Sequence, residues 1–118
     1  MAVPPKTDHK ISLDLAQKAI GRHRAALRSA AASAVQSAPA RPAVAYGFHA
    51  SAFHRILGQP GCIGIRAYPA LKEDGQPSLV LVGVDEQGND MTAGELSDFT
   101  WECPPFCPPD DSALLGVG

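Results

Sequence analysis

The first half of the chain contains a long series of mostly apolar positions with helical spacing. These positions recur at alternating intervals of three and four residues: Leu13, Ala16, Ile20, His23, Leu27, Ala30 and Ala34. That spacing is typical of one face of an amphipathic helix. Ser12 is a suitable N-cap, and the negative charge of Asp14 falls in the first turn, where the helix dipole favours it. The pattern predicts a helix over residues 13–36, preceded by a loose arm of residues 1–11.

A second, shorter helix is predicted after a proline-rich connector. Pro39 and Pro42 cannot continue a helical hydrogen-bond ladder, so residues 37–47 are expected to be an extended linker. Gly58 and Pro60 then provide a typical C-terminal stop. The apolar residues between these two signals have helical spacing and predict a helix over residues 48–57: Phe48, Ala52, Phe53, Ile56 and Leu57.

From residue 62 onward the apolar positions change to the alternation of β-strands. Residues 62–70 alternate and predict a half-buried strand, whereas residues 78–85 are apolar on both faces, as in a central strand. Turn residues separate these two segments, which favours a hairpin. A short third strand is predicted over residues 89–93, which completes an antiparallel meander.

Two helices followed by consecutive strands indicate an α+β domain, which we place at residues 12–102. The segment from residue 95 to residue 102 fits either a helical turn or an edge strand. Residues 103–118 form a tail rich in proline and cysteine, which we expect to be extended. A chain of 118 residues is long enough for one such domain.

The net charge of −2 hides a strong asymmetry between the two halves of the chain. Residues 1–60 carry a net charge of +6 and residues 61–118 a net charge of −8. This contrast suits a basic helix packed near an acidic sheet within one monomer, or opposite charges that meet between subunits. Nucleic-acid binding is not expected, because the acidic half would repel phosphates.

The cysteines are the most specific chemical feature of the sequence. Cys103 and Cys107 are separated by three residues, and together with Cys62 and His54 (or His49) they could supply the four ligands of a zinc site. The other interpretations are structural thiols and a disulfide. A Cys103–Cys107 disulfide requires neighbouring backbones, which an extended Pro-Pro segment opposes unless a cis proline folds it back. No other cofactor is expected.

The sequence contains no motif that predicts a catalytic residue. Cys62 is the only plausible nucleophile, with His54, Arg55 and Arg66 as possible activating neighbours. However, a cysteine that begins a core strand is more often a packing residue. The sequence contains no Gly-x-Ser-x-Gly or His-Glu-x-x-His motif.

Three segments together resemble a family of small bacterial proteins. They are Gln59-Pro-Gly-Cys-Ile-Gly-Ile-Arg66, then Leu79-Val-Leu-Val-Gly-Val-Asp85 with Gly88-Asn-Asp90, and finally Cys103-Pro-Pro-Phe-Cys107. The resemblance covers about residues 48–107 and implies no activity, cofactor or catalytic residue. It does imply that the second helix, the hairpin and the cysteine tail form one unit.

These observations favour a non-enzymatic module that binds a protein partner or assembles with itself. The alternative is a zinc-binding or thiol-based protein that uses Cys62, Cys103, Cys107 and a histidine. A cytoplasmic location without a membrane span is expected, because no apolar run approaches the length of a transmembrane helix and the odd number of cysteines suits a reducing compartment.

Overall fold

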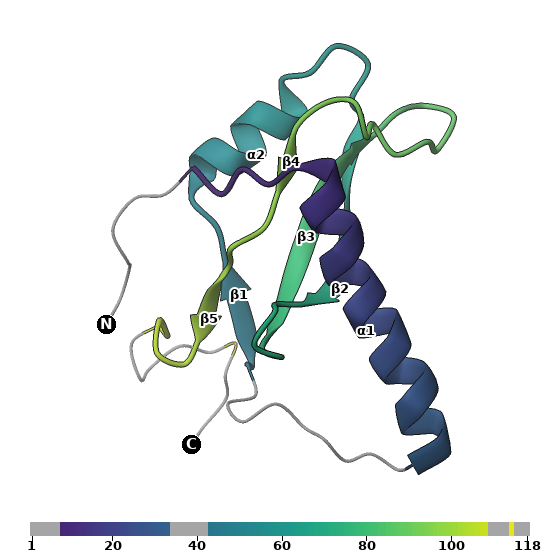
Figure 1. Cartoon of the computed structure of the whole chain (residues 1–118). Coiled ribbons are helices and arrows are strands. Elements are labelled where there is room, and N and C mark those ends of the chain that lie inside the picture. Colours follow the sequence, from purple (N-terminus) through teal and green to yellow (C-terminus); the bar gives the residue numbers. More distant parts are fainter. Residues whose placement is uncertain (1–7, 34–42, 109–113, 115–118) are drawn as a thin grey trace.

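The computed structural model describes residues 8–33, 43–108 and 114, and these residues form an α+β fold (Figure 1). Helix α1 spans Leu13–Ser33, and helix α2 spans Ala50–Leu57. The strands are β1 (Ala45–Gly47), β2 (Gly64–Leu71), β3 (Pro77–Val84), β4 (Leu96–Ser97) and β5 (Trp101–Cys103). The fold class predicted from the sequence is therefore confirmed.

The β2–β3 hairpin is the centre of the fold. Its antiparallel register runs from Gly64 opposite Val84 to Leu71 opposite Pro77. β4 pairs with the other side of β3, so that β3 is the central strand of the sheet β2-β3-β4. The apolar pattern of residues 78–85 on both faces has this physical reason: β3 has a neighbouring strand on each side and packed side chains on both faces.

Helix α1 covers one face of this sheet through small side chains. Ala16 and Ala19 are 2% and 3% exposed, and they pack with Val80, Val82 and Leu96 in the main hydrophobic cluster. Because alanine has little volume, the helix axis can approach the strands closely. Figure 1 shows α1 running alongside the hairpin and extending beyond its end.

Helix α2 and the loop after it cover the opposite face of the hairpin. Ala52 and Ile56 are fully buried, and α2 contacts both β2 and β3. The side chains of Cys62 and Gln59 approach Gly83, where a Cβ atom would lie only 3.0 Å from either of them. A glycine in β3 is thus required for the close approach of this loop.

A second, two-stranded sheet joins segments that are far apart in the sequence. β1 pairs antiparallel with β5, with Ala45 opposite Cys103 and Gly47 opposite Trp101. A Cβ atom on Gly47 would lie 2.9 Å from the indole Cε3 of Trp101, so the glycine allows the ring to lie over β1. The linker predicted over residues 37–47 therefore ends in a strand, and its residues 37–42 lie outside the described part.

The segment before α1 packs against the sheet, although the sequence predicted a loose arm over residues 1–11. The backbone of His9 accepts a hydrogen bond from the Asp98 N–H at 2.9 Å, and the Ile11 N–H donates to the Leu96 carbonyl at 3.2 Å. Lys10 forms a β-bridge with Ser97. Residues 9–11 thus occupy the outer edge of β4; residues 1–7 lie outside the described residues.

The third strand was predicted at the wrong place. Residues 89–93 form only an isolated bridge between Val84 and Asp90, and the third strand is β4 instead. Two tight turns follow this bridge, with the Thr92 N–H bonded to the Asp90 carbonyl and the Gly94 N–H to the Met91 carbonyl. These turns lift the chain away from β3 until Leu96 can pack into the core.

The other predicted helices and strands are present with shifted bounds, whereas Cys103, predicted as the first residue of an extended tail, is the last residue of β5. The first helix was predicted over residues 13–36, and residues 34–36 lie outside the described part. The second begins at Ala50 rather than residue 48, because its N-cap His49 is extended (φ −63°, ψ 146°). The strands predicted over residues 62–70 and 78–85 correspond to β2 and β3. Among the described residues, neither helix has the length and hydrophobicity that a transmembrane segment requires.

Candidate functional site

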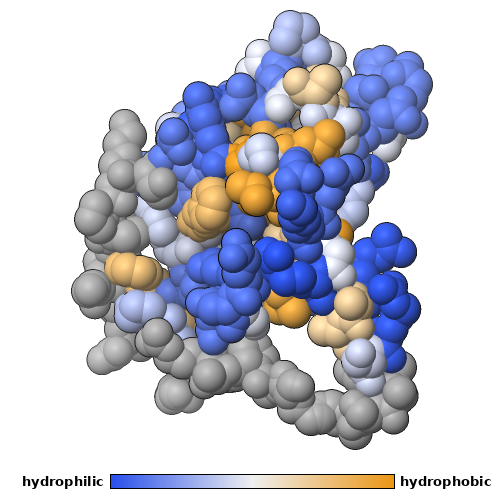
Figure 2. Space-filling view, in the orientation of Figure 1, coloured by the Kyte–Doolittle hydropathy of each residue, from blue (hydrophilic) through white to orange (hydrophobic). Residues whose placement is uncertain are grey.

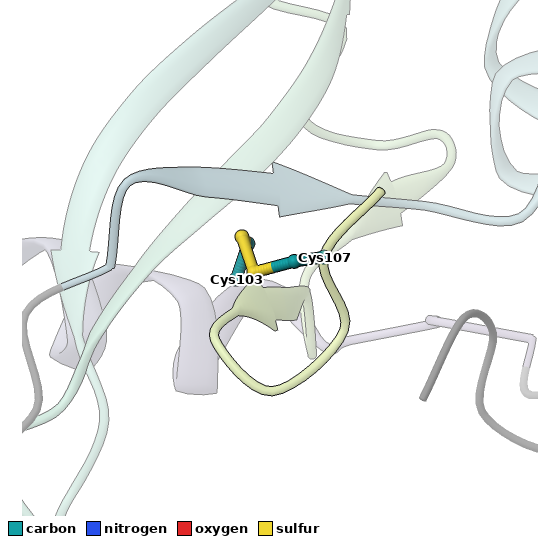
Figure 3. The surroundings of a disulfide bond; sticks show 2 residues. All are labelled: Cys103 and Cys107. Carbon is teal, nitrogen blue, oxygen red and sulfur yellow. A yellow bond between two sulfur atoms is a disulfide. The ribbon is translucent and has the colours of Figure 1, made fainter. Parts of the chain in front are cut away.

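Cys103 and Cys107 form a disulfide bond, which was one of the alternatives that the sequence left open (Figure 3). Their Cα atoms are 4.7 Å apart. The peptide bonds before Pro104 and Pro105 are both cis, which is the condition under which a Cys-Pro-Pro segment folds back on itself. Figure 3 shows Cys103 on β5 and Cys107 in the loop that follows, with β1 alongside.

The four residues suggested as zinc ligands are not brought together in this oxidised state. Cys103 and Cys107 are bonded to each other, whereas the thiol of Cys62 donates to the Gly64 carbonyl at 3.2 Å. His54 is exposed on α2. Among the described residues, no three His, Cys, Asp or Glu side chains are grouped as metal ligands are. A zinc site therefore stays a prediction about the reduced chain.

Both arginines that could activate Cys62 as a nucleophile are engaged elsewhere. Arg55 pairs with Glu95 (3.3 Å between Nε and Oε1) and also donates to the Asp8 carbonyl. Arg66 pairs with Asp90. The hydrogen bond of the Cys62 thiol goes to a backbone carbonyl rather than to a base. This arrangement is that of a packed thiol, not of a thiol–base pair.

His9 is a buried residue that the sequence analysis missed. Its Nδ1 atom lies 3.0 Å from both the Asp98 and the Phe99 carbonyl oxygens, so Nδ1 carries the hydrogen and donates. Its Nε2 atom accepts a hydrogen bond from the His49 N–H at 3.1 Å. A single imidazole therefore ties together the segment before α1, the link between β4 and β5, and the start of α2.

Aromatic rings surround His9. The centroids of Phe48 and Trp101 lie 5.1 Å and 5.8 Å from its ring, and the His49 ring packs edge-to-face on Trp101. Such contacts suit a packed junction between elements more than a catalytic centre. No sequence signal indicated that His9 is buried, because the segment around it has no hydrophobic periodicity from which burial could be predicted.

The free edge of β2 is the second feature that the sequence did not show. The Gly83 carbonyl accepts a hydrogen bond from the Met91 N–H, so the backbone groups of Gly83 point away from β2. Because this direction alternates along a strand, the other odd-numbered positions of β3 also point away from β2. Ile65 lies opposite Gly83. The backbone groups of Ile65, Ala67, Pro69 and Leu71 therefore point outward from the hairpin.

Most of this edge is open in the described structure. Ala67 and Pro69 are exposed, and Ile63, just before the strand, is 63% exposed. At the far end, Arg22 of α1 donates from Nε to the Leu71 carbonyl at 2.8 Å. The side chains of Ile63, Ile65, Ala67 and Pro69 share one face by the two-residue period of a strand. β2 thus presents an apolar row beside unpaired backbone groups.

No protein-family model, no curated protein and no solved structure matches this chain. The geometry described above is therefore the basis for a functional proposal, and the resemblance to small bacterial proteins stays a prediction.

Proposed function

We propose that this protein is a non-enzymatic assembly module that pairs with a second copy of itself through the free edge of β2. The observation that carries the proposal is the outward-facing backbone of Ile65 and Ala67, which has no partner strand in the described structure. An open strand edge is a template for another strand, because its N–H and C=O groups gain hydrogen bonds when a strand is added.

Pro69 favours one register of this pairing. Proline has no N–H, and position 69 is an outward-facing position, so the strand loses one donor there. An antiparallel pair centred on Ala67 places Ala67 opposite its own copy, where the two residues exchange both backbone hydrogen bonds. Ile65 then lies opposite Pro69 of the second copy, and its N–H reaches the Pro69 carbonyl, so the missing donor costs little.

The side chains of the edge are self-complementary in this register. Arg66 and Tyr68 both bond to the Asp90 carboxylate on the face covered by α1. In the antiparallel pair, Arg66 of one copy lies opposite Tyr68 of the other, and the Asp90 carboxylates lie within reach of both guanidinium groups. A guanidinium group over an aromatic ring is a favourable contact, and a twofold axis repeats each such contact.

The charge distribution also supports association between copies. Arg24 and Arg28 on α1 are exposed, and they form no ion pair with the described residues. The same is true of Glu73 and Glu86 in the acidic half. Arg55–Glu95 is an ion pair between the two halves, but these four exposed charges stay unpaired within one copy. Opposite charges on separate surfaces steer like molecules toward each other.

The test is the oligomeric state of the native chain and of a variant that changes only the edge. Sedimentation of the native protein across a range of concentrations is expected to show a monomer–dimer equilibrium. Ala67→Pro removes the outward N–H without removing a bond to β3, and should raise the dimer dissociation constant by about tenfold or more. Ala67→Ser retains the N–H and is the matched control.

Two outcomes would overturn this proposal. The first is a native protein that stays monomeric at all concentrations, in low as well as high salt. The second is a dimer whose dissociation constant is the same for Ala67→Pro as for Ala67→Ser. Circular dichroism and thermal unfolding of both variants establish that the fold is unchanged.

The second candidate is a thiol-based or zinc-binding protein, and the observation that favours it is the Cys103–Cys107 pair. We also propose the cytoplasmic location expected from the sequence, where thiols are kept reduced. There, the two sulfurs would be free as ligands. Metal analysis of reduced protein, compared with the Cys62→Ala, Cys103→Ala, Cys107→Ala triple variant, tests this candidate: the absence of stoichiometric zinc argues against it.

A further inference from the structure

The free edge of β2 is short for an interface between two copies. The Ile63 N–H already donates to the Val84 carbonyl at 2.8 Å, and the Leu71 carbonyl accepts from Arg22. Strand pairing is therefore limited to residues 65–69. Stable interfaces contain about 20–30 residues on each side. A dimer that pairs at this edge, as proposed above, therefore needs a second contact between the copies.

One side of helix α1 faces the free edge of β2. On the other side of the helix, Lys18 and Arg22 line a groove that also includes Asp98, the residue directly after β4. β4 and the free edge of β2 lie at opposite margins of the sheet. Because successive helical residues are about 100° apart, Arg24 and Arg28 lie about 160° and 120° from Arg22 around the helix axis. These two arginines therefore lie on the side of the free edge.

The core-facing stripe of α1 continues beyond the sheet. Ile20 packs against the main hydrophobic cluster. Leu27 lies only about 20° from Ile20 around the helix axis, yet it is 57% exposed. Figure 1 shows the reason, since the second half of α1 extends past the end of the hairpin. Leu27 is thus a core-facing apolar residue that the described residues of its own copy leave largely uncovered.

The dimer register places the second half of α1 beside a turn of the other copy. α1 passes the end of β2 at Arg22, whose Nε donates to the Leu71 carbonyl. In the antiparallel pair centred on Ala67, this end of β2 lies beside the start of β2 in the second copy. The start of β2 pairs with the end of β3, where the turn of residues 85–89 begins. The α1 residues after Arg22 therefore lie next to that turn.

The turn of residues 85–89 is acidic and lies toward the face of the sheet that α1 covers. Arg66, whose side chain lies on that face, donates from Nη1 to the Gly88 carbonyl at 3.2 Å. Hydrogen bonds within the turn hold the Asp85 carboxylate, whereas Glu86 is exposed and forms no ion pair with the described residues. Figure 2 shows hydrophilic surface (blue) where this turn projects at the upper right of Figure 1. Glu86 is thus open to a cation of another molecule.

We propose that the second half of α1 docks on the 85–89 turn of a second copy, with Arg28 paired to Glu86 and Arg24 beside them. The same turn then covers Leu27. A twofold axis repeats the contact at the other end of the paired strands, so one dimer contains two such contacts. This inference rests on the proposed pairing of β2 edges, and it adds the contact area that the short strand pair lacks.

The test is an exchange of charges between two variants, Arg28→Glu and Glu86→Arg. In each variant's own dimer, both contacts bring like charges together, so the dimer dissociation constant should rise about tenfold. In a mixed dimer, one contact joins the two introduced charges, which are opposite, and the other contact keeps the native pair. The mixed dimer should therefore be tighter than either variant's own dimer. Sedimentation at low salt, with one variant fluorescently labelled, measures all three dissociation constants.

Lys10→Glu is the matched control, because it changes the net charge as Arg28→Glu does. Lys10 forms a β-bridge with Ser97 at the outer edge of β4, on the opposite margin of the sheet from the free edge. A mixed dimer of Lys10→Glu and Glu86→Arg keeps like charges at one contact, so it should be weaker than the Lys10→Glu dimer. If net charge alone governed association, this mixture would show the same preference as the exchange pair.

The docking of α1 is refuted if the mixed dimer of Arg28→Glu and Glu86→Arg is no tighter than both homodimers, or if the Lys10→Glu mixture shows the same preference. In either case, a native dimer that Ala67→Pro weakens still supports the pairing of β2 edges. A native chain that stays monomeric refutes both proposals. The three residues changed are exposed, and circular dichroism of each variant checks that the fold is kept.

Discussion

The Cys103–Cys107 disulfide closes a very short loop, since the two residues are separated by only 4 positions. In the chain-entropy description, a loop of about five residues removes roughly 7 cal/mol/K from the unfolded ensemble, or about 2 kcal/mol at 25 °C. The bond also holds β5, whose Cys103 carbonyl accepts from the Val44 N–H at 2.8 Å. Reduction should therefore lower the free energy of unfolding by about 2 kcal/mol and Tm by roughly 8 °C.

Denaturant unfolding with and without a phosphine reductant measures this loss. The matched control is Cys103→Ala with Cys107→Ala, since Cys103 is 2% exposed and a serine hydroxyl there would be buried. Cys62 is a free thiol in both proteins, so the reductant should leave the double variant unchanged. A loss below about 0.5 kcal/mol in the native chain would refute the loop-closure estimate, and would show that the folded tail needs no covalent closure.

Two further predictions concern the core and the buried carboxylate. Ile56→Ala should lower the free energy of unfolding by about 2–5 kcal/mol, and Ile56→Val by about 0.5–1.5 kcal/mol, because Ile56 is fully buried; equal losses in chemical denaturation would contradict this. Burial raises the pKa of Asp98, so the folded state binds a proton more tightly than the unfolded state, and the stability falls as pH rises from about 4 through the folded-state pKa. Asp98→Asn should remove that part of the pH dependence; an unchanged slope of unfolding midpoint against pH would contradict it.

The helices and the hairpin could be predicted because their signals are local. The apolar spacing in α1 and the alternation in β2 both depend on neighbours a few residues away, and the turn between β2 and β3 contains Gly75 at φ +87°. The same local rules gave the wrong third strand. Residues 89–93 follow a turn, as a strand would, but after the Val84–Asp90 bridge the Thr92 N–H bonds to the Asp90 carbonyl and the Gly94 N–H to the Met91 carbonyl, so the backbone turns away from β3.

The candidate sites could not be predicted, because they depend on pairings across long stretches of sequence. β1 and β5 are too short to show a hydrophobic period of their own. Glycine is needed at position 47 only because the Trp101 ring packs against it. His9 is buried because residues from β4, β5 and the start of α2 close around it. The outward direction of the Ile65 and Ala67 backbone groups follows from the register between β2 and β3, which the hydrophobic pattern of a strand does not specify.

The charge asymmetry and the β2 edge should act on different steps of the proposed association. In the described residues, the ion pairs Arg66–Asp90 and Lys72–Glu102 lie within the acidic half, and Arg55–Glu95 joins the two halves. The exposed α1 cations therefore attract the acidic half of a second copy at long range. Salt screens this attraction and slows the encounter of the two copies. Backbone hydrogen bonds form only after contact, so their loss in Ala67→Pro should increase the dissociation rate. Added salt should thus lower the association rate of both proteins equally, while the ratio of their dissociation rates stays constant.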